Sequence, residues 1–135
     1  MVAKVIFRRG LSGAIALPIS VFCMSGVAAQ EAIQLPSGLE VTLQEVRFEE
    51  QMGRFRFIAP AIGPEGVSYM EVREDFPWLC AEMVVPVLTQ TDRSVPEVVI
   101  SLADREVTFG EITPGATQYF EVFSVSDGTC IWEEF

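Results

Sequence analysis

The sequence predicts an α+β domain, in which one short helix at about residues 75–86 packs on a mostly antiparallel sheet of about six or seven strands. Two observations predict this class. One segment carries apolar residues at helical spacing, and the rest consists of short runs of alternating apolar and polar residues separated by turn residues. Residues 30–135, a stretch of 106 residues, are enough for one core, so we expect a single small domain there.

Residues 1–29 have the pattern of a secretory signal peptide. A basic start precedes an uncharged apolar run over residues 11–29, which ends in the small residues Val27-Ala28-Ala29. The basic residues of that start are Lys4, Arg8 and Arg9. The alternative is a retained membrane anchor, because a run of 19 residues nearly spans a bilayer. Pro18 lowers the hydrophobicity of the run, so we expect cleavage before Gln30 and an exported protein, periplasmic or secreted.

The chain after residue 29 is strongly acidic. It holds six arginines and 19 acidic residues, a net charge of −13, and it has neither lysine nor histidine. Such a chain repels nucleic acids and anionic lipids, so we expect no nucleic-acid partner and no membrane contact after cleavage. A protein partner selected by charge would be basic. The alternative is that the acidic surface only keeps a small exported protein in solution.

Two cysteines remain once the leader is removed, because Cys23 lies inside it. In an oxidising compartment an even pair predicts one disulfide, here between Cys80 and Cys130. Free buried thiols and a shared metal ion are the alternatives. A zinc site would have too few soft ligands, since the chain has no histidine. We therefore expect the disulfide, and neither a metal nor another cofactor.

The first part of the domain is expected to form a hairpin. Residues 39–43 alternate as a half-buried strand does, the alternation slips at Gln44–Glu45 as at a β-bulge, and residues 54–58 return as the second strand. Residues 59–66 are rich in proline and glycine and predict a loop, and residues 67–72 predict a third strand.

The helix carries the cysteine at its centre. Its apolar face consists of Phe76, Leu79, Cys80, Met83, Val84 and Val87. Asp75 is expected to cap the first turn, where Pro77 is tolerated because no N–H is needed there. We expect Pro86 to end or kink the helix, since it cannot donate a hydrogen bond to the carbonyl of Glu82.

Four further strands are predicted in the second part, at residues 97–102, 106–109, 118–126 and 129–135. Asp127-Gly128 is typical of a tight hairpin turn between the last two. One face of residues 118–126 carries Tyr119, Glu121, Phe123 and Val125, and the other carries Phe120 and Val122. In the last strand, Cys130 and Trp132 share one face and Ile131 lies on the other.

Arginines alternate with phenylalanines over residues 54–57. Basic and aromatic residues in alternation also occur in proteins that bind single-stranded nucleic acids. The acidic total and the expected export argue against that function. We expect Phe55 and Phe57 to point inward, and Arg54 and Arg56 to pair with acids of the neighbouring strand.

The chain after residue 29 lacks the groups that most enzymes use. Without histidine, lysine or a free thiol it cannot assemble a Ser-His-Asp or Cys-His arrangement or a Schiff base, so we predict no enzyme and no catalytic residue. Carboxylates occur in three groups: Glu49 with Glu50, Glu71 with Glu74 and Asp75, and Glu133 with Glu134. They leave two alternatives, a carboxylate-dependent hydrolase of an envelope polymer and a weak cation site at the second group.

These observations favour a non-catalytic protein-interaction or envelope-associated module. An inhibitor of a basic envelope enzyme is an alternative that differs only in its partner. The candidate interaction patch consists of Trp78, Tyr119, Trp132 and Phe135, because a disulfide would bring both tryptophans near each other. The alternative for the tryptophans is core packing around the bridge.

Four segments resemble a family of small exported bacterial proteins of unknown function. They are Trp78–Cys80, Val98–Arg105, Ala116–Glu121 and Thr129–Phe135. The resemblance covers most of the chain after residue 29. It implies export and a paired cysteine, and it supplies neither an activity nor a site.

Overall fold

The computed structural model describes residues 10, 13–18 and 31–134. Most of the predicted signal peptide, residues 1–29, lies outside the described residues, so its cleavage stays a prediction. Within the described ranges, no helix combines the length and the apolar character that crossing a membrane requires.

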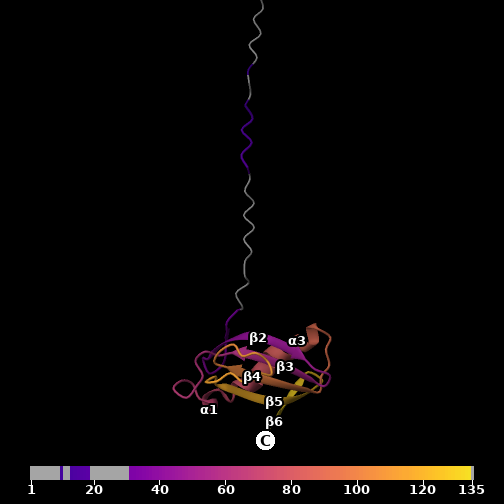
Figure 1. The fold of residues 1–135 in the computed structure, drawn as a ribbon. Coiled ribbons are helices and arrows are strands. Elements are labelled where there is room, and N and C mark those ends of the chain that lie inside the picture. Colours follow the sequence, from indigo (N-terminus) through magenta and orange to yellow (C-terminus); the bar gives the residue numbers. More distant parts are fainter. Residues whose placement is uncertain (1–9, 11–12, 19–30, 135) are drawn as a thin grey trace, which may run out of the picture.

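Six strands form one mixed sheet in the order β1 to β6 (Figure 1). They are β1 (Ile33–Gln34), β2 (Glu40–Phe48), β3 (Met52–Ile58), β4 (Glu97–Ala103), β5 (Gln118–Ser126) and β6 (Thr129–Glu133). Neighbouring strands run antiparallel except β3 and β4, which are parallel. Parallel strands need a long crossover, and residues 59–96 supply it. The α+β class and the mostly antiparallel sheet predicted from the sequence are confirmed.

Two local features of the sheet follow the predicted chemistry. The register of β2 against β3 shifts between Leu43 and Glu45, which is the predicted bulge. Asp127 and Gly128, between β5 and β6, have φ values of 48° and 73°. A two-residue hairpin turn of type I′ needs positive φ at both positions, so the predicted turn is confirmed.

The crossover carries the helices, and residues 75–90 form one continuous helical stretch. It consists of α2 (Asp75–Leu79), a π-helical turn η1 (Cys80–Val84) and α3 (Val85–Gln90). The helix does not end at Pro86, as one of the two predictions for this proline had it, because α3 continues to Gln90. In the wider turn the N–H of Val85 bonds to the carbonyl of Cys80, so the chain passes a proline that has no N–H to offer and continues for another turn.

Residues 67–72 do not form the predicted strand. Tyr69–Val72 is a short helix, α1, which begins after Ser68. The carboxylate of Glu71 accepts a hydrogen bond from the N–H of Ser68 at 2.8 Å. A serine followed three residues later by glutamate is a helix-start signature, and here it outweighs the strand propensity of Val67, Tyr69 and Val72.

Residues 106–109 also differ from the predicted strand and belong to a loop, residues 104–117. Val107 is buried. Its carbonyl accepts hydrogen bonds from Gln44 Nε2 at 3.1 Å and from Arg56 Nη2 at 2.6 Å. The hydrogen bonds of the Val107 carbonyl therefore come from side chains of β2 and β3 and not from a neighbouring strand.

Asp75 does not cap its helix as predicted. The cap position is Glu74, and Asp75 is buried, with 2% of its surface exposed. Its carboxylate accepts hydrogen bonds from the backbone N–H of Ser37, at 3.0 Å, and from the Ser37 hydroxyl, at 2.5 Å. Asp75 thus ties the turn before β2 to the start of α2.

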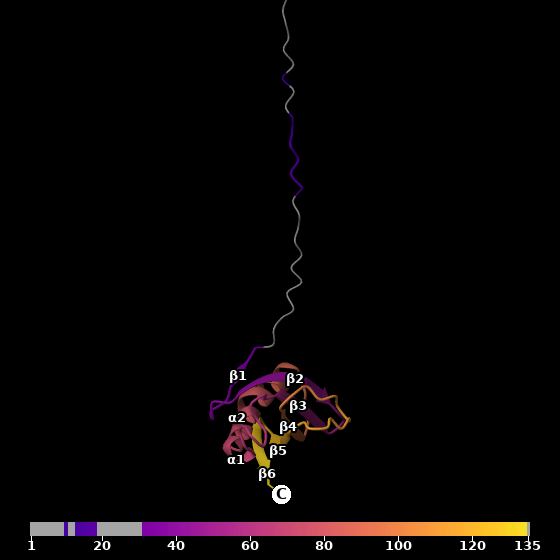
Figure 2. The ribbon, with the colours of Figure 1, turned by 60° about the vertical axis from the view of Figure 1, so that its left-hand side comes forward.

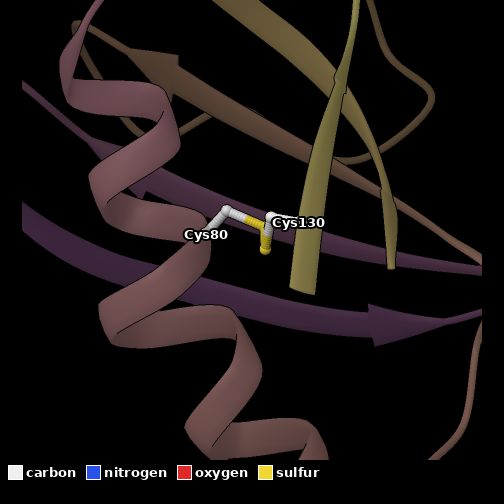
Figure 3. Close-up of a disulfide and its surroundings, with 2 residues drawn as sticks. All are labelled: Cys80 and Cys130. Atoms are coloured by element: carbon white, nitrogen blue, oxygen red, sulfur yellow. A yellow bond between two sulfur atoms is a disulfide. The ribbon is translucent and has the colours of Figure 1, made fainter. Parts of the chain in front are cut away.

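The core lies between one face of the sheet and the helices. Figure 2 shows α1 and α2 on one side of the strands and the orange loop, residues 104–117, on the other. The largest buried side chains on the sheet are Phe55, Phe57, Ile100, Leu102 and Phe123, and they meet Phe76 and Leu79 of α2. The predicted Cys80–Cys130 disulfide joins η1 to β6 (Figure 3), with 6.3 Å between the Cα atoms.

Candidate functional site

The sheet has a second face, which points away from the helices and which we call the outer face. Its side chains are Arg54 and Arg56 on β3, Val99 and Ser101 on β4, Phe120 and Val122 on β5, and Ile131 on β6. The same alternation that buries one set of side chains presents this set outward. No helix of the described chain covers this face (Figure 2).

Loop 104–117 lies over the part of the outer face that belongs to β2 and β3. The ring of Phe109 faces three guanidinium groups, with centroid distances of 4.3 Å to Arg47, 5.5 Å to Arg54 and 5.6 Å to Arg56. Cation–π contacts and the bonds to the Val107 carbonyl hold the loop against the sheet.

Acids compensate the arginines beneath this loop. Arg47 and Arg54 lie directly opposite each other on β2 and β3, an arrangement of like charges that is unfavourable alone. Glu45 bonds to both Arg47 and Arg56 at 2.5 Å, and Glu49 bonds to Arg54 at 2.9 Å. The hydrogen bond from Arg56 lowers the pKa of the Glu45 carboxyl, as does the nearby charge of Arg47. The expected pairing of Arg54 and Arg56 with acids is confirmed.

A hollow of about 310 Å³ separates the loop from β5. Val99, Phe120 and Val122 form its apolar floor, and Phe109 and Glu111 of the loop line its rim. A volume of this size is at the lower limit of ligand-binding pockets.

Exposed apolar side chains concentrate on this side of the molecule. In residues 31–134, five large apolar side chains are exposed, and four belong to the outer face or its loop. We call these four the outer-face patch: Phe109, Ile112 (95% exposed), Phe120 (65%) and Ile131 (54%). Acids lie beside the patch: Glu97 and Ile131 align with the same residue of β5, and Glu133 aligns with Val122.

The structure places three of the four residues of the predicted interaction patch against the core. Trp132 stacks on Phe123, with 5.9 Å between ring centres. The Tyr119 hydroxyl donates to the Val67 carbonyl at 3.1 Å, and Trp78 is half-buried and packs against the core. Phe135 lies outside the described residues. These contacts are those of the core-packing alternative, and the predicted patch itself stays a prediction.

The sequence contained the signal for the residues that are exposed instead. The alternation that turns Tyr119, Cys130 and Trp132 inward turns Phe120 and Ile131 outward. An apolar side chain on the solvent face of a strand was the informative observation.

A second hollow, of about 220 Å³, lies at the sheet edge where β6 ends, and we call it the edge recess. It is lined by Tyr69, Arg73, Phe120, Glu121, Val122, Trp132 and Glu134. Arg73 pairs with Glu134 at 2.6 Å, and Glu121 accepts hydrogen bonds from the Tyr69 hydroxyl and, at 2.8 Å, from Trp132 Nε1. Burial raises the pKa of Tyr69, and the carboxylate of Glu121 raises it further.

In the second and third carboxylate groups predicted from the sequence, the bonded carboxylates have different hydrogen-bond partners. Glu71 bonds to Ser68 and Asp75 to Ser37, whereas Glu133 bonds to Ser124 and Glu134 to Arg73. Among the described residues, no group of three or more Asp, Glu, Cys or His side chains is arranged to hold a metal ion.

The fold and these surfaces define a disulfide-linked α+β protein whose exposed features are an apolar patch and an acidic, aromatic recess. The chain belongs to the family described as "Family of unknown function (DUF6497)", which matches residues 20–135. This match confirms the part of the resemblance that concerns a family of unknown function. Neither a curated protein nor a solved structure matches the chain.

Proposed function

We propose that the protein is an exported, non-catalytic interaction module that binds a basic protein through the outer-face patch. The observation that carries the proposal is the gathering of four exposed apolar side chains on one face and its loop. Single exposed apolar residues are common, whereas a group of them rimmed by polar residues marks an interaction site.

Charge supports a basic partner. All six arginines after residue 30 have an intramolecular contact: five are in ion pairs, and the guanidinium of Arg93 lies 4.4 Å from the ring of Phe48. The 19 acids outnumber these arginines threefold, so the molecule carries a large uncompensated negative charge. Such a field attracts basic proteins and speeds their encounter.

The rest of the proposal rests on the chemistry of the chain. A disulfide persists in oxidising compartments outside the cytosol, which fits the predicted export signal. The absence of histidine and lysine after residue 29 removes the usual nucleophile and base pairs. An inhibitor of a basic envelope enzyme would use the same surface, so it is one form of this function.

Site-specific photocrosslinking in the producing cells tests the proposal. A photoreactive phenylalanine analogue replaces Phe120, Ile131 or, as the control, Met70, which is at least as exposed as either of them and lies outside the outer-face patch. We expect Phe120 and Ile131 to yield the same crosslinked protein, with a basic isoelectric point, and Met70 to yield none of it. Crosslinks of equal yield at all three positions, or a single acidic product, would contradict the proposal.

A further inference from the structure

Arg73 occupies the edge recess with its own side chain. Its guanidinium carbon lies 4.7 Å from the centre of the Trp132 ring, and its Nη2 donates to Glu134 at 2.6 Å. An aromatic face combined with a carboxylate is the arrangement by which proteins bind cationic side chains. The recess therefore already holds a cation that the chain itself supplies.

The recess carries more negative charge than Arg73 neutralises. Two carboxylates, Glu121 and Glu134, line it together with one guanidinium. The partners of Glu121 are the hydroxyl of Tyr69 and the indole N–H of Trp132, which are neutral donors and leave its charge uncancelled. The recess would therefore attract a second cation, or a cation that lies closer to Glu121 than the Arg73 guanidinium does.

The recess also adjoins an open sheet edge. The last residue of β6, Glu133, pairs with Val122 of β5, so residues 118–121 of β5 have no neighbour on that side among the described strands. Phe120 and Glu121 of this open edge line the recess. An unpaired strand edge accepts an extended segment through backbone hydrogen bonds, and adjacent pockets select its side chains.

We propose that the edge recess receives an arginine or lysine side chain from an extended segment of the basic partner, and that Arg73 occupies this place in the free protein. The segment adds to β5 along residues 118–121, and its cation replaces that of Arg73 on the Trp132 ring, near Glu121 and Glu134. This inference rests on the proposed function and describes its partner more closely.

A short peptide provides the first test. The probe is acetyl-Thr-Val-Arg-Val-Thr-amide, and its control replaces arginine by citrulline, which keeps the shape and removes the charge. The full chain, labelled with nitrogen-15, has two indole N–H signals, from Trp78 and Trp132. We expect the arginine peptide to shift the Trp132 signal and leave that of Trp78 in place, and the citrulline peptide to shift neither. Equal shifts with both peptides, or a shift of Trp78 alone, would overturn the proposal.

Removal of Arg73 provides the sharper test, because the proposal makes it a competitor. Arg73→Gln should bind the arginine peptide about fivefold more tightly, given the energies of exposed ion pairs and cation–π contacts. Arg105→Gln removes the same charge from an exposed ion pair with Asp104 in the loop, and it should change the affinity less than twofold. If both variants gain equally, general electrostatics explains the effect and the competition is excluded.

Removal of the Glu134 carboxylate, which would bind the incoming cation, provides a third test. The Glu134 side chain is mostly exposed, so Glu134→Gln should leave the fold intact and weaken the arginine peptide about fivefold, whereas Glu82→Gln, on the exposed side of the helix, should not. Unchanged affinity in Glu134→Gln would remove the recess from the binding. The two proposals fail separately: crosslinks at Ile131 without peptide binding overturn only the recess, and peptide binding without those crosslinks overturns only the outer-face patch.

Discussion

Cys80, the first residue of the π-helical turn, is bonded to Cys130 of the last strand across 50 residues of sequence. The helix is held to β4 and β5 by apolar packing, but β6 is an end strand with one strand neighbour. The disulfide therefore gives this end strand a second anchor, to the helix. It also holds in place the residues next to the edge recess, because Trp132 and Glu134 follow Cys130 directly.

Removal of the disulfide should cost much of the stability of the protein. In the chain-entropy treatment, opening a loop of 50 residues costs about 4 kcal/mol, which is a large part of the stability of a small domain. We expect Cys80→Ala with Cys130→Ala to lower the urea midpoint and to raise the dependence of unfolding free energy on urea, because the unfolded chain expands. The wild-type protein under reducing conditions is the control, and an unchanged midpoint in both would contradict this expectation.

Asp75 should contribute to stability through Ser37 rather than through its own helix. Asp75→Ala leaves the hydroxyl and the N–H of Ser37 without their acceptor, and hydrogen bonds to charged groups are each worth about 1.5–3 kcal/mol. We expect a loss of about 3 kcal/mol in chemical unfolding. Ser37→Ala removes only one of the two bonds and should cost less. The double variant should be no worse than Asp75→Ala alone, since the two residues act as one unit; full additivity would argue that Asp75 acts elsewhere.

Stability should fall in acid, in part because of Glu45. Its pKa in the folded protein is lowered from 4.5 by Arg56 and Arg47. A carboxyl with a lowered folded pKa stabilises the protein above its unfolded pKa, and this contribution is lost as the pH falls through the folded pKa. We expect the urea midpoint to decline below about pH 4.5, and Glu45→Gln to decline less steeply. Glu65→Gln, in an exposed loop, should follow the wild type; identical curves for all three proteins would remove Glu45 from the acid response.

The contact between Phe109 and the three arginines should hold loop 104–117 closed over β2 and β3. Cation–π contacts are worth about 0.5–1 kcal/mol each at exposed sites. Phe109→Ala should therefore open the loop more often and speed tryptic cleavage after Arg105 about tenfold. Thr108→Ala is the control in the same loop. Equal cleavage rates would mean that the hydrogen bonds to Val107 hold the loop without the ring.

Much of the fold could be predicted from local patterns. Helical spacing identified the face of residues 76–87, the slip at Gln44–Glu45 identified the bulge, and Asp127-Gly128 identified the last hairpin. Each of these signals lies within a few residues of the structure that it specifies. The disulfide could be predicted because only two cysteines follow residue 29 and the expected compartment is oxidising.

Two predicted strands, residues 67–72 and 106–109, are not strands in the structure, and a hydrogen bond made by a side chain accounts for each. The first is local, between Glu71 and the N–H of Ser68, whereas the second is long-range, from Arg56 to the Val107 carbonyl. The parallel pairing of β3 with β4 depends on how the crossover returns, which no short pattern encodes. The exposure of Phe120 and Ile131 follows from which face of each strand packs on the helices, and the sequence alternation alone does not say which face that is.

The outer-face patch should separate binding from stability. Phe120 and Ile131 are largely exposed, and substitutions at exposed positions usually change the free energy of unfolding by less than about 0.5 kcal/mol. We expect Phe120→Thr with Ile131→Thr, which places β-branched residues in the strands, to retain the urea midpoint and to lose the crosslink to the basic partner when the photoreactive residue is moved to Ile112, in the same patch. Val99→Thr with Val122→Thr, on the floor of the hollow next to loop 104–117, should weaken binding less, because these side chains are half-buried. If the first pair instead destabilises the protein by several kcal/mol, these apolar residues serve the fold, and the interaction must be sought elsewhere on the molecule.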